Sequence, residues 1–403
     1  MLTPEEIRDL VETLQPTLDG LNAWITKDLI RRFLARMERH EKLRISNTDA
    51  WQIEVYKSAG GHVEDLRAQL AKFTNYTDAE IAAIFEDAGI RAYAADALVY
   101  TSAGITVEPL AQSEHMISIL EDTYRRTKGE VHNFTRTTAI QSQKRLINTL
   151  DAAHMKVYTG AQSYTAAVIE AVEELATGQA EVLYPSGHVD TLETAVLRAV
   201  RTGTAQASGN MAIQGMVDHD WDIILVSAHL GARYGDGGEN PGNHFWWQGK
   251  FYSRTGRSPG LPLFEKATGY GTGPGLSGWN CRHSFGPGDG VHNPYTQWDS
   301  EENKKVYDLS QQQRKMERNI RKTKQKILGY QEAITACTDP ATKGELQAVF
   351  EKTALSLQTQ NKAYNSFCEQ EKLKRFDDRL KVAKWSRSEA SRATAAARRA
   401  ANK

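Results

Sequence analysis

Residues 221–294 restrict the possible folds most, because their composition differs from that of both flanks. They begin with WDIILVSAH, whose apolar and β-branched residues predict a buried strand. Many glycines and aromatic residues follow, and WWQGKFYS predicts a second strand or a hairpin arm. The flanks show helical patterns, and we expect no strand in them. The sequence therefore predicts a mainly helical α+β protein with a small α+β centre rich in glycine and aromatic residues.

Helical signals dominate the N-terminal region. Thr3, Pro4 and Glu6 form a capping box with proline at the first helical position. Thr77 and Glu80 form a second capping-box pair. Between the two boxes, apolar residues recur every four positions and predict one buried helix face: Leu21, Ile25, Leu29, Phe33 and Met37. We therefore predict a helical N-terminal domain over residues 1–110.

Helical patterning returns at residue 299. The sequence CTDPATKG around Pro340 predicts the turn between two antiparallel helices. Phe350, Leu357 and Tyr364 are seven residues apart, which is coiled-coil spacing. We therefore predict a helical hairpin over residues 299–385. The Ser-, Ala- and Arg-rich composition of residues 386–403 predicts a basic flexible tail.

Charge is distributed unevenly, although the net charge is zero. Residues 301–403 carry 23 Lys and Arg against 13 Asp and Glu, whereas residues 1–300 carry 27 against 37. Such asymmetry indicates a nucleic-acid or acidic partner for the C-terminal part. Six basic residues share one broad face of the first hairpin helix: Arg314, Lys315, Arg318, Arg321, Lys322 and Lys326. We expect this face to bind phosphates of duplex DNA without sequence specificity, or an acidic protein surface, or to be simply solvated.

The cysteines and the N-terminus bear on the compartment. Cys281, Cys337 and Cys368 are too few and too scattered for a disulfide framework. The first residues, MLTPEEIRDLVETL, carry acids where a signal peptide carries bases, and no apolar run reaches membrane-spanning length. We expect a soluble protein made in a cytoplasm.

Cys281 and His283 are the strongest candidates for chemistry. They are two residues apart, so an extended segment would place both side chains on one face. With His229 and His244 they are candidate zinc ligands, because zinc takes three or four such ligands. A packed thiol with a hydrogen-bonded histidine explains the same residues, and a thiolate–imidazolium nucleophile is a third interpretation. The expected cofactor is therefore none, or a structural zinc.

Four motifs follow one another in this central stretch: SAHLGAR from Ser227 to Arg233, WQG with Tyr252 and Ser253, TGYG from Thr268 to Gly271, and GWNCRH from Gly278 to His283. In this order they resemble the phage minor capsid protein 2 family, which is related to the Mu F-like head morphogenesis proteins. A longer insertion, GDGGENPG, separates the first motif from His244 here. The resemblance implies that eight residues hold the centre together: Trp247, Gly249, Tyr252, Tyr270, Trp279, Asn280, Cys281 and His283.

The resemblance implies a Mu F-like minor capsid core over residues 111–298. It implies a non-enzymatic minor structural protein of a tailed phage head, which acts in head morphogenesis near the portal and contacts packaged DNA. Such a protein is made in the host bacterial cytoplasm and resides in the virion, in the head interior or at the portal vertex. Its partners would be portal and capsid proteins, with residues 1–110 as the docking region.

An enzyme is the alternative class. A metal-dependent hydrolase or nuclease would use His229, Cys281 and His283. No paired carboxylates accompany these residues at motif spacing, which counts against hydrolysis.

Overall fold

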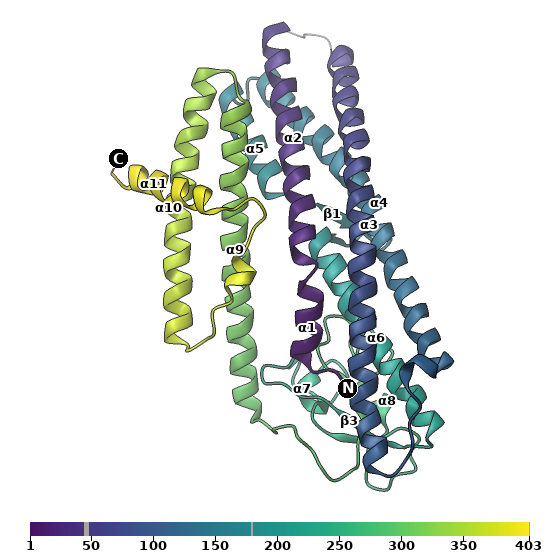
Figure 1. Ribbon diagram of the computed structural model, residues 1–403. Helices are drawn as coiled ribbons and strands as arrows, with labels where there is room; N and C mark the ends of the chain where they lie inside the picture. Colours follow the sequence, from purple (N-terminus) through teal and green to yellow (C-terminus); the bar gives the residue numbers. More distant parts are fainter. Residues whose placement is uncertain (44–47, 179, 403) are drawn as a thin grey trace. The chain divides into compact units, whose positions relative to one another are not determined.

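The computed structural model describes residues 1–43, 48–178 and 180–402, with the side chains of residues 40–50 outside the description. Over this range the chain forms eleven α-helices and two small antiparallel sheets (Figure 1). The expected class, mainly helical α+β, is confirmed. Among the described residues, no helix combines the length and the apolar character that crossing a membrane requires.

The chain divides into two compact units, each built from three separated segments. The first unit comprises Met1–Gln15, Asn75–Asn133 and Thr194–Gln311, and the second comprises Pro16–Thr74, Phe134–Glu193 and Gln312–Lys403. This division differs from the consecutive segments 1–110, 111–298 and 299–385 expected from the sequence. Long helices contribute residues to both units, and the periodicity of a helix does not reveal where its packing partners change.

The first unit contains α1 (Pro4–Glu12), the 3₁₀ turn η1 (Leu110–Gln112), the short helices α7 (His244–Trp247) and α8 (Phe264–Thr268), and α6 (Leu192–Asp218) from Thr194 onward. It also contains parts of α3 (Thr48–Ser102) and α4 (Glu114–Tyr158) and the start of the helix that begins at Ser300. The predicted capping box of α1 is confirmed: the Thr3 hydroxyl accepts the Glu6 N–H, and the Glu6 carboxylate accepts the Thr3 N–H. The second box is wrong as a helix start, because α3 runs through Thr77 without a break. Its apolar side chains are buried on both sides of Thr77, so tertiary packing maintains the helix there.

The first unit also contains a three-stranded sheet in the order β4-β3-β5. Its strands are β3 (Ile223–Val226), β4 (Phe251–Ser253) and β5 (Phe285–Pro287), and both pairings are antiparallel. The predicted strand in WDIILVSAH is confirmed as β3. In WWQGKFYS only FYS is a strand, whereas both tryptophans lie in α7. The core against this sheet contains Trp247, Tyr252 and Phe285 together with Tyr100 and Met216 from the helices.

The second unit contains α2 (Gln15–Leu43), α5 (Tyr164–Thr177), α10 (Pro340–Gln370), α11 (Arg387–Ala401) and the 3₁₀ turn η2 (Asp377–Leu380). It also contains the remaining parts of α3 and α4 and the part of α9 (Ser300–Ala336) from Gln312 onward, while the start of α9 belongs to the first unit. All five residues of the predicted apolar stripe of α2 are buried. A hairpin of β1 (Glu181–Leu183) and β2 (Val189–Thr191) lies outside the segment to which we confined β structure. Its strands are three residues long, too short for alternation to be recognised.

The predicted helical hairpin turn is confirmed. Asp339 caps α10 by accepting the Thr342 N–H, and Pro340 occupies the first turn. Tyr364 of α10 donates a 2.9 Å hydrogen bond to Glu317 of α9, so the two helices are linked by a buried polar contact as well as by apolar packing.

The C-terminal segment forms helix α11 where a flexible tail was expected. Ala393, Ala396 and Ala397 are buried, and the helix packs against α10. Arg399 adds an ion pair with Glu351, with 2.7 Å between Nε and Oε1. The alanine-rich composition explains the difference, because alanine has the highest helix propensity and lets two helices approach closely.

Candidate functional site

Three of the four candidate metal ligands come together in the first unit. His244 is the first residue of α7, and Cys281 and His283 precede β5. One ligand atom from each of the three lies within 4.8 Å of the other two, and all three side chains are buried. His229, which follows β3, is outside this group; its ring stacks on that of His283 with 4.6 Å between centroids.

Gln248 determines which nitrogen of His283 carries the proton. Its side-chain oxygen Oε1 accepts the backbone N–H of His229 at 3.0 Å, which identifies it as the acceptor. The same oxygen lies 2.9 Å from His283 Nε2, so Nε2 must carry hydrogen and donate it. In the neutral ring Nδ1 then holds a lone pair, and it lies 3.7 Å from Cys281 Sγ.

His244 is fixed in the same way by a backbone carbonyl. Its Nε2 lies 2.9 Å from the carbonyl oxygen of Pro274, which can only accept. Nε2 therefore donates, and Nδ1 holds the lone pair of the neutral ring. In both histidines of the group, Nε2 thus donates a hydrogen bond that holds the ring, and Nδ1 carries no proton.

Burial keeps the cluster uncharged. It raises the pKa of the Cys281 thiol to about 11 and lowers the pKa of His244 to about 4. Burial also lowers the pKa of His283 well below its ordinary value, and nearby His229, His244 and Arg233 add to that effect. A nucleophilic cysteine needs a thiolate at neutral pH. These environments favour the thiol and the neutral imidazole, which counts against the thiolate–imidazolium interpretation.

The glycine-rich stretch before Cys281 is closely packed at its C-terminal end. Gly275, Leu276, Ser277 and Gly278 are all buried, and Leu276 belongs to the core of the sheet. A Cβ at Gly275 would collide with the carbonyl of Gly269, and one at Gly278 with that of Gly273. These glycines are needed because main-chain segments cross at close range.

Six of the eight residues expected to hold the centre together do lie in it. Trp247, Tyr252, Cys281 and His283 are buried, and Tyr270 packs on Phe285 with 4.9 Å between ring centroids. Gly249 has φ +63°, which favours glycine. Trp279 and Asn280 are on the surface instead, and the Trp279 side chain is 65% exposed. The Trp279 carbonyl still accepts a 2.6 Å hydrogen bond from Arg233, so the main chain at this position is structural.

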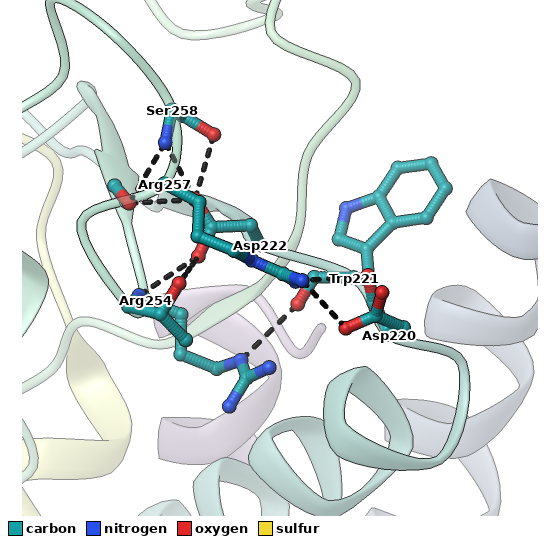
Figure 2. A network of polar contacts seen from close by, with 8 residues as sticks. Asp220, Trp221, Asp222, Arg254, Arg257 and Ser258 are labelled. Atoms are coloured by element: carbon teal, nitrogen blue, oxygen red, sulfur yellow. Dashed lines mark hydrogen bonds and ion pairs between the residues drawn. The ribbon is translucent and has the colours of Figure 1, made fainter.

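Asp222 organises the loop after β4, and no sequence motif pointed to it. Figure 2 shows its carboxylate at the centre of the contacts: Ser253 and Ser258 hydroxyls donate to Oδ2 at 2.6 Å each, and Thr255 donates to Oδ1 through its N–H and its hydroxyl. Burial raises the pKa of Asp222, but these hydrogen bonds outweigh it and hold the pKa well below its usual range. The alternation of Ser and Thr in SRTGRS is the only local signal.

The six basic residues predicted to contact DNA divide into two sets. Arg321 pairs with Glu193 and Asp19, and Lys326 pairs with Glu173, all within the second unit. Lys315, Arg318 and Lys322 are exposed, and Arg314 is half-buried. The structure thus assigns part of the expected face to internal ion pairs. The three exposed cations Lys315, Arg318 and Lys322 form a basic ridge on α9.

A second polar cluster, in the second unit, has the residue types of a hydrolase triad. His62 Nδ1 lies 2.6 Å from Asp28 Oδ2, and His62 Nε2 lies 2.7 Å from Ser142 Oγ. The three residues lie on α2, α3 and α4, so no local motif could reveal them. Ser142 is 4% exposed and His62 is fully buried, whereas a nucleophile must reach its substrate. We interpret the cluster as a satisfied buried polar contact.

The fold and the site together define a mainly helical α+β protein in which a buried Cys/His cluster and a close-packed glycine segment flank a small sheet. The family model for phage minor capsid protein 2 matches residues 2–369, nearly the whole chain, and the chain belongs to this family. It is a phage minor capsid protein and thus a component of the virion, as the motif resemblance implied. Comparisons with curated proteins and with solved structures gave no match.

Proposed function

We propose that this minor capsid protein acts in head morphogenesis near the portal vertex and contacts packaged DNA through the basic ridge of α9. The protein is made in the host cytoplasm, enters the head as a structural component, and has no catalytic role. The single observation that carries the DNA contact is the ridge itself. Its three exposed cations lie at positions i, i+3 and i+7 of one helix.

The basic ridge is long enough to contact a few phosphates of the DNA backbone. Seven residues of α-helix span about 10 Å, which corresponds to a few phosphates along one DNA strand. Glu317, an acid between Lys315 and Arg318 in the sequence, is buried and bonded to Tyr364, so it does not neutralise the exposed face. Flexible cations without a base-reading element give affinity without sequence specificity.

The test is titration of duplex DNA into the full-length protein at several salt concentrations. If three phosphates are neutralised, log K should fall with log salt at a slope of about −2.7. Replacing Lys315, Arg318 and Lys322 by glutamine should remove most of that slope. A matched control replaces Lys343, Lys352 and Lys362, which are exposed on α10, and so removes the same charge. Equal effects of both triple variants, or no binding at low salt, would reject the ridge as a DNA contact.

The capsid or portal contact is proposed for the part of α3 in the first unit. Tyr76, Ile90 and Leu98 are 53%, 52% and 68% exposed there, which is high for large apolar side chains. Serine at Ile90 and Leu98 should leave the isolated protein folded and reduce its incorporation into heads, measured by quantitative mass spectrometry of purified virions. Normal incorporation would reject this surface. Deleting residues 1–110 is not a usable test, because Leu2 and Tyr100 belong to cores of the first unit.

The hydrolase or nuclease alternative conflicts with burial. Cys281 and His283 are 3% and 1% exposed, so a DNA phosphodiester could not reach them in this conformation. Incubating the protein with supercoiled plasmid and Zn²⁺, Mg²⁺ or Mn²⁺ should leave the plasmid intact. Cleavage that disappears in His283→Gln would favour the enzyme.

A further inference from the structure

We propose that His244, Cys281 and His283 bind one zinc ion, which fixes the glycine-rich segment against the sheet of the first unit. The donor set is two imidazole nitrogens and one thiolate, a combination typical of zinc. Among the residues that the structure describes, these three form a group with ligand atoms within 4.8 Å of one another.

The spacing of Cys281 and His283 fits a shared ion. With Zn–S of about 2.3 Å and Zn–N of about 2.0 Å, a tetrahedral ion separates its sulfur and nitrogen ligands by about 3.5 Å. Cys281 Sγ and His283 Nδ1 are 3.7 Å apart. A simple thiol–imidazole hydrogen bond would account for that pair, but it would not require a ligand atom of His244 to lie within 4.8 Å of both.

The outer contacts of the histidines provide an independent argument. A histidine that binds a metal through one nitrogen almost always donates the other N–H to a carbonyl or a carboxylate, which fixes the tautomer and the ring orientation. His283 donates to the Gln248 side chain and His244 donates to the Pro274 carbonyl. Both rings are therefore fixed in the tautomer that leaves Nδ1 available, before any metal binds.

The main chain around the three ligands indicates the structural role that a zinc ion would have. The segment between Pro274 and His283 contains little regular structure, and its main chain crosses itself at Gly275 and Gly278. Zinc would join α7 to this segment at two positions, Cys281 and His283. The remaining coordination position would be taken by water, since His229 stacks on His283 outside the ligand group.

The first experiment uses the wild-type full-length chain. Protein purified without chelators, incubated with zinc and then desalted should contain one zinc per chain by inductively coupled plasma mass spectrometry. Replacing zinc by Co²⁺ should produce a thiolate-to-cobalt charge-transfer band. X-ray absorption should show one sulfur ligand and two or three nitrogen or oxygen ligands. Folded wild-type protein that retains no zinc and gives no cobalt band would overturn the proposal, whatever the variants do.

The second experiment assigns the ligands. Cys281→Ser should lose the cobalt band, and His244→Asn should weaken zinc retention at least tenfold in competition with a chromophoric chelator. Cys368→Ser is the matched control, because Cys368 is also buried but lies in α10 of the second unit. It should keep both the band and the zinc. A cobalt band that persists in folded Cys281→Ser would overturn the assignment.

Discussion

Arg321 and Glu193 form a two-point ion pair within the second unit: Nη1 and Nη2 of the arginine each lie 2.7 Å from one carboxylate oxygen. Asp19 accepts a third hydrogen bond from Nη2 at 3.0 Å. Burial lowers the pKa of Arg321, but the two carboxylates outweigh that effect and raise it. The pair links α9 to α2 and to the first turn of α6, so this arginine is structural although the nearby Arg318 and Lys322 are exposed.

Arg321→Gln should lower the free energy of unfolding by about 3 kcal/mol, because it removes the partly buried cation that contacts both carboxylates. Urea denaturation followed by circular dichroism measures the change. Lys322→Gln, at the adjacent exposed position, should stay within about 0.5 kcal/mol of the wild type. Similar losses in both variants would mean that the ion pair has no special role.

Asp222→Asn should destabilise the first unit by about 2 kcal/mol near neutral pH, since an amide accepts the loop's hydrogen bonds less strongly than a carboxylate. Because the folded-state pKa of Asp222 lies below the unfolded value of about 3.9, the stabilisation is present above that pH and is lost as pH falls toward the folded pKa. The difference between wild type and variant should therefore shrink in acid. Asp220→Asn is the control, because Asp220 is 83% exposed and pairs only with Arg257 among the contacts in Figure 2. A difference that is constant from neutral to acid pH would contradict this account.

Gly278→Ala should cost about 3 kcal/mol, because the added methyl would collide with main-chain carbonyls that cannot rotate away. Gly344→Ala is a matched substitution in α10, where an added Cβ meets nothing within 4 Å. It should stabilise the protein by about 0.5–1 kcal/mol through helix propensity and reduced chain entropy. Thermal unfolding of the two variants should thus shift in opposite directions.

Ser142→Ala should lower the free energy of unfolding by about 1–2 kcal/mol, because it leaves His62 Nε2 buried without its partner. A fluorophosphonate probe should not label native wild-type protein at Ser142. Labelling that depends on His62 would show instead that the cluster is accessible and works as a hydrolase triad.

The sequence was sufficient where the signal is local. The capping box at Thr3, the apolar run of β3 and the turn at Pro340 each lie within a few residues, and each was predicted correctly. The Thr77 box failed because tertiary packing carries α3 through it. Contacts such as His62 with Asp28 and Ser142 join residues 34 and 80 positions apart, and no periodicity encodes them.

The candidate site was predicted only in part for the same reason: local signals were readable from the sequence, and contacts between distant residues were not. The two-residue spacing of Cys281 and His283 indicated their proximity correctly, whereas only the fold distinguishes His244, which joins them, from His229, which stacks outside. The resemblance named Trp279 among the residues that hold the centre together, whereas its side chain is exposed. On α9, Arg321 and Lys322 look equivalent in the sequence, and only the positions of Glu193 and Asp19 separate them.

The crossing of main chain at Gly278 also determines which mutations can be rescued genetically. At Gly203 an added methyl would meet the side chains of Thr127 and Phe85, so a smaller residue at either position can act as a second-site suppressor. At Gly278 the obstacles are the carbonyls of Thr272 and Gly273, which every residue type possesses. A selection for revertants should therefore return compensating changes for Gly203→Ala but only true reversion for Gly278→Ala.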